Sequence, residues 1–283
     1  MHEATAIANS ATNPAERVEA ILSEDLAHGD AMLGSIAPIL RHLLANDDHS
    51  VFGDEVIARV RGMAAHITAQ LVSAVMECEP GDLDAAGKAL VADLGPAIVA
   101  HQGLLCHLHA LAMEWHLTER LQGRIALDPV LPPLLQALIA SGDPVTSGMA
   151  MKLLAAQSRF GQSQRRMQLP IGELPGDLLH ACLQALRTVT GLSEPDLQQR
   201  VIGAESEIRS RHDEAQGRLG IMARLVTGMS AGAVAALSIA HAGPAMFLTA
   251  LALASGQDRD LAVLATNESQ MARLALALRA AGL

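Results

Sequence analysis

Residues 54–78 read DEVIARVRGMAAHITAQLVSAVMEC, and their apolar side chains recur every three or four positions. In an α-helix this spacing places the apolar side chains in one stripe that faces a neighbouring element. The segment 83–94 has the same spacing. The two stripes consist of Val56, Val60, Met63, Ile67, Leu71 and Ala74, and of Leu83, Ala86, Leu90 and Leu94. The sequence therefore predicts amphipathic helices that pack against each other.

The composition favours helices throughout the chain. Half of the 283 residues are hydrophobic, but only 1% are aromatic and there is no tyrosine. The apolar residues are therefore mostly Ala, Leu, Val, Ile and Met, and no stretch shows the strict alternation of a half-buried strand. We predict an all-α protein of stacked helical hairpins, which is either a HEAT-like solenoid or a multi-helical bundle.

Prolines mark many of the expected helix starts. Seven of the 12 prolines follow a capping or turn residue, and a proline in the first helical turn loses no hydrogen bond. These are Pro14, Pro96, Pro129, Pro144, Pro175, Pro195 and Pro244. Together with the apolar spacing they predict helices at 14–28, 31–46, 54–78, 82–94, 96–123, 129–141, 144–167, 175–190, 195–225, 229–242, 244–255, 258–265 and 268–281.

Two short motifs indicate an internal repeat. Asp128-Pro129-Val130 and Asp143-Pro144-Val145 are each expected to open a helix, and each is followed by a Leu-Leu pair. Such starts before Ala/Leu-rich helices are typical of HEAT-type solenoids, in which each hairpin buries a face of the next.

Four stretches of the second half read AAQSRF at 155–160, RRMQLP at 165–170, ELP at 173–175 and RAAGL at 279–283. With these stretches, most of residues 80–283 resembles an uncharacterised bacterial family of helical proteins, a domain of unknown function. The resemblance implies a HEAT-like helical fold. It implies no activity, substrate or site residue.

Charge is distributed unevenly along the chain. The formal net charge is -10, and residues 1–125 account for it with 7 basic and 17 acidic side chains, whereas residues 126–283 carry 13 of each. An acidic surface argues against nucleic-acid binding and suits a basic partner. We therefore expect a disordered N-terminus at 1–12, an acidic helical part at 13–125 and a HEAT-like helical part at 126–283, the last two either separate or joined in one continuous domain.

The sequence predicts a cytoplasmic protein. Cys78, Cys106 and Cys182 are odd in number and far apart, which suits free thiols in a reducing compartment, and the first residues lack the pattern of a secretory signal. The uncharged stretch 226–257 is long enough for a membrane span, but Gly243-Pro244 interrupts it. We expect two buried helices there.

The predicted helix 96–123 is rich in side chains that bind metals. It contains His101, Cys106, His107, His109, Met113, Glu114 and His116. Cys106 and His109 can bind one ion together, whereas His109 and His116 are about 10.5 Å apart along the helix axis. Cys106, His109 and His116 are therefore the metal candidates, and no other cofactor is predicted. The alternative is that the histidines border the apolar face of the helix.

Lys152, Arg159, Arg165 and Arg166 lie in a stretch without acidic residues, from 144 to 172. The planar guanidinium of arginine can bind two oxygens of a carboxylate or phosphate, so these four residues are the predicted partner-binding site. The alternative is that they complement the dipole at the end of the helix 144–167.

The predicted helix 195–225 has a narrow apolar seam between mixed charges, which suits a homodimer contact through 196–226 or an outer helix of the stack. Its His212-Asp213-Glu214 triplet cannot converge on one atom, because helix neighbours point in different directions. No glycine-rich phosphate loop, serine elbow or HExxH motif is present. The sequence predicts a non-enzymatic scaffold or regulatory protein-interaction module, and the alternative is a small-ligand or metal-binding sensor using helix 96–123.

Overall fold

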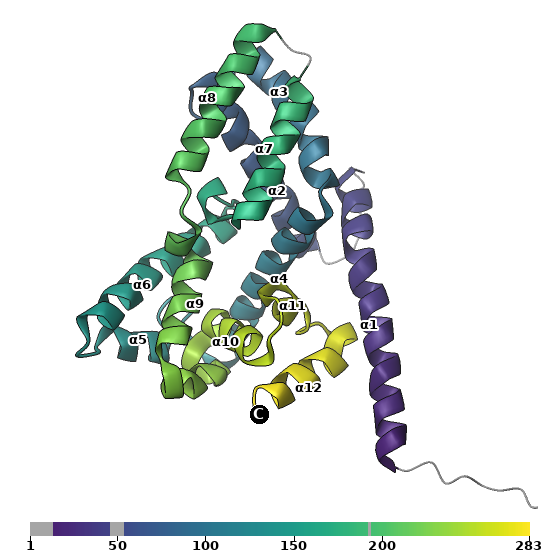
Figure 1. The fold of residues 1–283 in the computed structure, drawn as a ribbon, viewed down its shortest axis with the longest axis vertical. Helices are drawn as coiled ribbons and strands as arrows, with labels where there is room; N and C mark the ends of the chain where they lie inside the picture. The colour runs from purple at the N-terminus through teal and green to yellow at the C-terminus, as the bar shows by residue number, and fades with distance from the viewer. Residues whose placement is uncertain (1–13, 46–53, 192–193) are drawn as a thin grey trace, which may run out of the picture.

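The structure, a computed structural model, describes residues 14–45, 54–191 and 194–283 (Figure 1). Every regular element in these residues is a helix, so the all-α prediction is confirmed. The expected disordered N-terminus at 1–12 lies outside the described residues.

Long helices dominate the first part of the chain and shorter ones the last. The first part forms α1 (Pro14–Ala45), α2 (Asp54–Met76), α3 (Ala85–Ala100) and α4 (Gln102–Ile125). The middle forms α5 (Pro133–Ile139), α6 (Pro144–Arg165), the 3-10 helix η1 (Ile171–Glu173), α7 (Gly176–Thr190), α8 (Pro195–Arg211) and η2 (Glu214–Gln216). The last part forms α9 (Arg218–Gly228), η3 (Ser230–Leu237), α10 (Ile239–Ser255), α11 (Arg259–Leu264), η4 (Glu268–Gln270) and α12 (Met271–Ala280).

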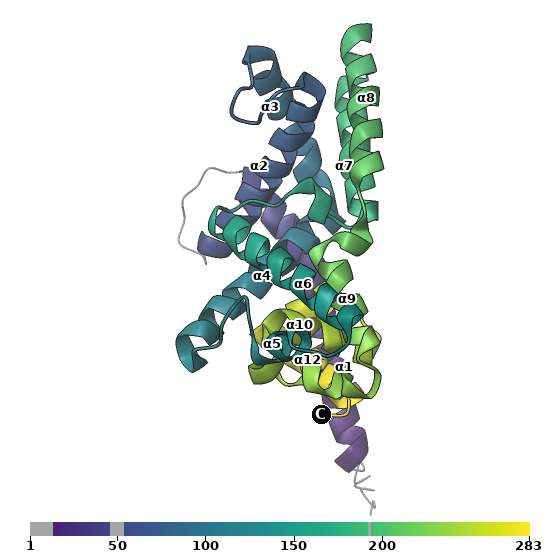
Figure 2. The same ribbon diagram turned by 90° about the vertical axis from the view of Figure 1, so that its left-hand side faces the viewer.

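Two apolar clusters hold these helices together. The first contains side chains of α2, α3, α4, α7 and α8. The second contains side chains of α5, α6, α9, α10, α11 and α12. Helix α4 belongs to both, through Leu108 in the first and Ala110 in the second. In Figures 1 and 2 the hairpin of α7 and α8 lies near α2 and α3 at one end of the molecule, and α10 to α12 gather at the other. The division of the chain near residue 125 stays a prediction.

The stripe of residues 54–78 forms the inner face of α2. Val60, Met63, Ile67 and Leu71 are completely buried in the first cluster. Full burial of such a side chain contributes about 1.5–3 kcal/mol. The stripe therefore explains both the helix and its position between α3, α4 and α8.

Helix α1 is continuous, although two helices were predicted there. It runs through Gly29 and Asp30, where the chain end packs against it: Gln270 Nε2 donates a hydrogen bond to Gly29 O at 2.7 Å, and Arg273 forms an ion pair with Asp30. A Cβ atom at Gly29 would lie 2.8 Å from Gln270 Oε1. This glycine therefore allows a close approach and does not end the helix. We call these two contacts the α1 strap.

The break between α3 and α4 lies at His101, and the predicted break at Gly95-Pro96 is wrong. Pro96 lies inside α3. His101 ends α3, and its Nδ1 accepts a hydrogen bond from Leu104 N at 3.1 Å, which caps α4. The cap is made by a histidine, a residue outside the usual set of N-caps.

The two Asp-Pro motifs are not equivalent. Asp143 caps α6 by accepting hydrogen bonds from the amides of residues 145 and 146, as predicted. Asp128 accepts bonds from Val130 N and Leu131 N, both at 2.8 Å, and forms a turn, so α5 begins only at Pro133. The prediction that both motifs open helices is wrong for the first, because its aspartate closes a turn.

The predicted helix 195–225 is two helices, α8 and α9, separated by residues 212–217. The chain folds back so closely that a Cβ atom at Gly220 would lie 2.3 Å from Glu214 O. The predicted seam is divided: Val201 is buried in the first apolar cluster and Met222 in the second. A dimer contact along one continuous helix is therefore wrong, and self-association through residues 196–226 stays a prediction.

The uncharged stretch 226–257 contains a break, as predicted. Gly243 has a φ of 73°, a conformation that glycine adopts without strain, and α10 changes direction there. Residues 242–252 are buried. Among the described helices none is by itself long and apolar enough to cross a membrane, and only α3 and α4 taken together reach that length and composition, with a bend of 85°.

Candidate functional site

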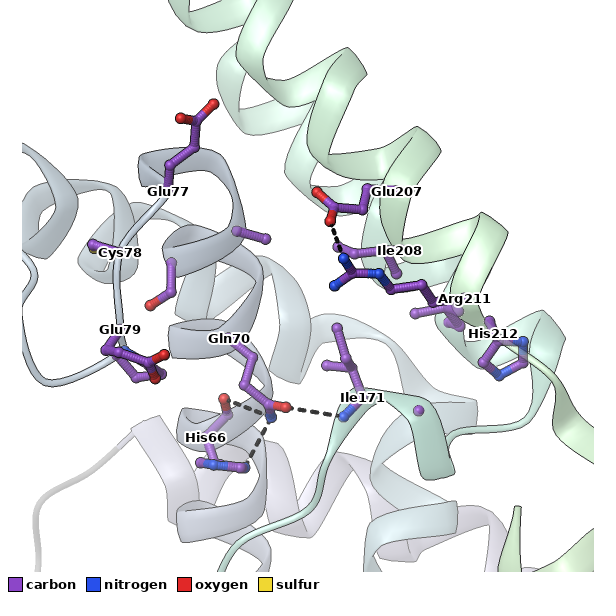
Figure 3. Close-up of a pocket in the computed structure, with 15 residues that line it drawn as sticks. His66, Gln70, Glu77, Cys78, Glu79, Ile171, Glu207, Ile208, Arg211 and His212 are labelled. Carbon is purple, nitrogen blue, oxygen red and sulfur yellow. Dashed lines mark hydrogen bonds and ion pairs between the residues drawn. The ribbon is translucent and has the colours of Figure 1, made fainter. Parts of the chain in front are cut away.

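A cleft of about 870 Å³ opens between α2 and α8 (Figure 3). We call it the α2–α8 cleft. Its apolar lining includes Ala74 of α2, Ile171 of η1, Leu179 of α7 and Ile208 of α8. Helix α2 and three consecutive elements of the later chain, η1, α7 and α8, therefore meet in one concave surface.

Polar side chains of α2 and of the residue that follows α8 contact the backbone of the segment that contains η1. His66 Nδ1 lies 2.9 Å from Leu169 O, and Gln70 Nε2 donates a hydrogen bond to the same oxygen at 2.9 Å. Gln70 Oε1 accepts a bond from Ile171 N at 3.2 Å, which Figure 3 shows. From the other side, His212 Nε2 lies 2.9 Å from a carbonyl oxygen of the same segment. These four contacts hold the segment that contains η1 against α2 and against the residue that follows α8.

The upper edge of the cleft is acidic. Glu77 and Glu79 follow the last turn of α2, and both side chains are exposed and have no bonded partner in the described part of the chain. The carbonyl end of α2 adds negative potential at the same place. We call these two residues the acidic rim. Close by, Ser73 is 5% exposed and its Oγ has no partner among the described residues.

A second hollow, of about 450 Å³, lies between the end of α6 and the end of α8. Arg159, Arg166 and Arg211 line it, and we call it the arginine hollow. Its two acids already have partners: Glu173 accepts a bond from Arg218 N at 2.9 Å, and Asp213 accepts one from a backbone amide at 3.0 Å. Arg159 and Arg166 have no bonded side-chain partner within the described ranges. Three arginines and two acids therefore line the hollow, and two of the arginine side chains have no bonded partner among the described residues there.

The four predicted partner-binding residues are divided by the structure. Lys152, Arg159 and Arg166 are seven positions apart and share one exposed face of α6. The guanidinium of Arg165 lies 5.9 Å from the ring of Trp115, on another side of the helix. The structure brings Arg159 and Arg166 together with Arg211, which sequence reasoning missed because it comes from α8.

The metal candidates on α4 do not converge. Burial lowers the pKa of His109 to about 4, so its ring is neutral near pH 7. Burial, with Asp260 nearby, raises the pKa of the Cys106 thiol. In the described residues neither side chain has a third ligand close enough to share an ion with it.

His116 lies in a different group. Its ring nitrogen and the carboxylates of Glu55 and Glu119 lie within 4.8 Å of one another. Arg59 already approaches both acids, at 2.7 Å from Glu55 and 3.7 Å from Glu119. The guanidinium supplies the positive charge that a metal ion would bring. The two acids were missed in the sequence because they come from α2 and from the next turn of α4.

An ion cluster fills the interior between the two apolar clusters. Glu114 is fully buried and binds Arg218 at 2.7 and 3.1 Å and Arg259 at 2.8 Å. Burial alone would raise the pKa of Glu114, but the two guanidinium groups outweigh burial and lower the pKa to about 2. Arg218 also stacks 3.6 Å over the ring centre of Phe160. We call Glu114, Arg218 and Arg259, which bond one another, the interior ion cluster.

One histidine–aspartate pair has the geometry of a catalytic dyad. His107 Nδ1 lies 2.7 Å from Asp260 Oδ2, and His107 Nε2 has no partner in the part of the chain that the structure describes. His107 is only 2% exposed, and neither residue lines the hollows described above. A general base needs a substrate within hydrogen-bonding reach, which this position does not offer.

Comparisons of the chain with protein-family models, with curated proteins and with solved structures find no match. What the chain can bind is therefore inferred from the geometry and charge of its two hollows.

Proposed function

We propose that the protein is a non-enzymatic interaction module that binds an acidic segment of a partner protein at the arginine hollow. The observation that supports this best is that Arg159 and Arg166 line the hollow without an anionic partner in the described residues. An unpaired guanidinium keeps its capacity to bind a carboxylate through two parallel hydrogen bonds. Complementary charge of this kind supplies specificity and speeds association.

The position of these arginines also supports a docking role over the dipole alternative. Arg166 follows the last turn of α6, where a cation would favour the free carbonyls. Arg159 lies well inside the helix, where that effect has faded, yet it faces the same hollow. Arg211 approaches from α8 and has no connection with the dipole of α6. Three arginines from two helices thus face one concavity.

The test is affinity capture from a native lysate with the full chain as bait. Arg159→Glu combined with Arg166→Glu reverses the charge of the hollow. Arg120→Glu combined with Arg124→Glu makes the same charge change at exposed positions of α4. We expect some proteins to be captured by wild type and by the α4 control but not by the hollow variant. For such a protein, purified, the dissociation constant should rise at least about tenfold, or about 1.4 kcal/mol. Identical captured sets for all three baits would contradict the proposal.

A second candidate function is metal sensing, which the Glu55, His116 and Glu119 group favours. Imidazole and carboxylate ligands suit Zn²⁺. Titration calorimetry with ZnCl₂ tests it, with His116→Ala as the variant and His28→Ala, on the exposed part of α1, as the control. A stoichiometric site that disappears only in His116→Ala would support sensing. We rank it second because Arg59 already neutralises the two acids.

We also propose a cytoplasmic location in a bacterium and a HEAT-like relationship among the helices, as the resemblance of residues 80–283 implies. The three free cysteines support a reducing compartment. Cell fractionation tests the location.

A further inference from the structure

The α2–α8 cleft and the arginine hollow share a wall, because Gly172 and Arg211 line both. Arg211 is exposed and paired with Glu207 at 2.6 Å, as Figure 3 shows. The two hollows therefore adjoin beside η1. The acidic rim lines the first of these hollows, and Arg159 and Arg166 line the second.

We infer that the two adjoining hollows act as one bipolar groove, which binds one extended segment of a partner protein, with a cationic, aliphatic residue at the acidic rim and acidic residues at the arginine hollow. The inference rests on the proposed function, to which it adds the chemistry of the other half of the segment.

The lining of the α2–α8 cleft determines what the cationic residue must be. Ala74, Leu179 and Ile208 offer an apolar surface, and the unpaired carboxylates of Glu77 and Glu79 stand above it. Lysine and arginine bury an aliphatic stem along such a surface and keep the charged head at its polar edge. A purely apolar residue would leave both carboxylates unpaired, and an acidic residue would be repelled.

The bipolar charge favours a polypeptide over other anions. A nucleic acid or an anionic membrane would continue its row of phosphates from Arg159 and Arg166 toward Glu77 and Glu79, where like charges repel it. A single small anion would occupy only the arginine hollow. A polypeptide can carry both signs within a few residues. The cleft alone has the volume of a typical ligand site, roughly 300–1,000 Å³, at about 870 Å³.

The experiment is selection of random 12-residue peptides displayed on phage against the purified full chain. Two variants are selected in parallel: Arg159→Glu with Arg166→Glu, and Glu77→Lys with Glu79→Lys. Glu24→Lys with Asp25→Lys on α1 and Arg120→Glu with Arg124→Glu on α4 are the matched controls, since these residues are exposed and lie outside both hollows. Circular dichroism and thermal melting confirm that each variant folds.

Wild type and both controls should enrich peptides with Lys or Arg beside apolar residues at one end and Asp or Glu at the other. The Glu77 and Glu79 variant should lose the basic end alone, and the Arg159 and Arg166 variant the acidic end alone. Each loss should weaken the best wild-type peptide about tenfold or more. If wild type selects acidic peptides without a basic end, and Glu77→Lys with Glu79→Lys does not change their affinity, the bipolar groove is wrong. The proposed function would still stand. If wild type and the Arg159 and Arg166 variant enrich the same peptides, both the bipolar groove and the proposed function are wrong.

Cys78 gives a second, direct measurement in the unmodified chain. It is half-buried and lines the α2–α8 cleft, whereas Cys106 is half-buried on α4 outside both hollows. The selected wild-type peptide should slow iodoacetamide labelling of Cys78 several-fold and leave that of Cys106 unchanged, as followed by peptide mass spectrometry. Equal labelling of Cys78 with and without a peptide that binds would place the peptide elsewhere and refute the occupancy of the cleft.

Discussion

Glu114 and Arg218 form a two-point ion pair in the interior, with N–O distances of 2.7 and 3.1 Å, although they lie 104 positions apart in the chain. Arg259 completes the cluster on the second carboxylate oxygen. The pair joins α4 to α9, and Arg259 joins α4 to α11. The link between the two apolar clusters is therefore partly electrostatic.

Replacing the central acid should be strongly destabilising. Glu114→Gln keeps the shape of the side chain but leaves two arginines buried or nearly buried without a counter-charge. We expect the free energy of unfolding to fall by about 3–5 kcal/mol, measured by urea denaturation. Glu207→Gln, which breaks an exposed pair, should cost less than about 1 kcal/mol. A similar small loss in both variants would argue against the cluster as a structural centre.

Stability should decrease as the pH falls from about 6.5 to about 4, because of His109. Its pKa is 6.5 in its usual environment and about 4 in the fold. Between these values the unfolded chain binds more protons, so the folded state loses free energy as the pH falls, by at most about 1.4 kcal/mol per pH unit. In His109→Gln the slope in this window should be smaller, whereas His28→Gln, an exposed control, should keep the wild-type slope.

Two helical glycines should respond to alanine in opposite ways. A Cβ atom at Gly62 would lie 2.5 Å from Met167 O, where α2 meets the end of α6. Gly62→Ala should therefore cost about 1–3 kcal/mol through overpacking. Gly34 in α1 has no atom within 4 Å of the same position. Gly34→Ala should stabilise the protein by about 0.4–1 kcal/mol. In thermal melting we therefore expect Gly62→Ala to unfold below the wild-type temperature and Gly34→Ala above it.

Binding at the groove should depend on salt. Both ends use exposed charges, which are screened as the Debye length falls from about 10 Å at 0.1 M to about 3 Å at 1 M. The affinity of the selected wild-type peptide should fall steadily over this range in fluorescence anisotropy. A salt-independent affinity would indicate that apolar contacts alone hold the peptide.

Local signals predicted several helices well. Helix α6 begins at Pro144 after its Asp143 cap, as expected, and α2 ends at Met76, two residues before the predicted boundary. Two of the wrong boundaries have a different cause. Near Gly29 and residue 212 the backbone is set by contacts with Gln270 and Leu174, which are distant in the sequence. No local pattern contains this information.

The candidate site was predictable only in part. The stretch 144–172, which contains basic but no acidic residues, identified Arg159 and Arg166, because charge composition is visible in a sequence. Arg211 comes from α8 and the acidic rim from the turn after α2, and only tertiary packing brings the two hollows that they line next to each other. Arg218 and Arg259 could not be recognised in the sequence as the partners of Glu114, because they too come from other helices.

The α1 strap has a consequence for synthesis of the chain. Gly29 receives its hydrogen bond from a residue 241 positions later. During translation α1 emerges before η4 and α12, which pack against it, and these contacts form only after the region of Gln270 has left the ribosome. A ribosome stalled before that point would carry a nascent chain that is a substrate for chaperones and proteases, whatever the state of the helices between.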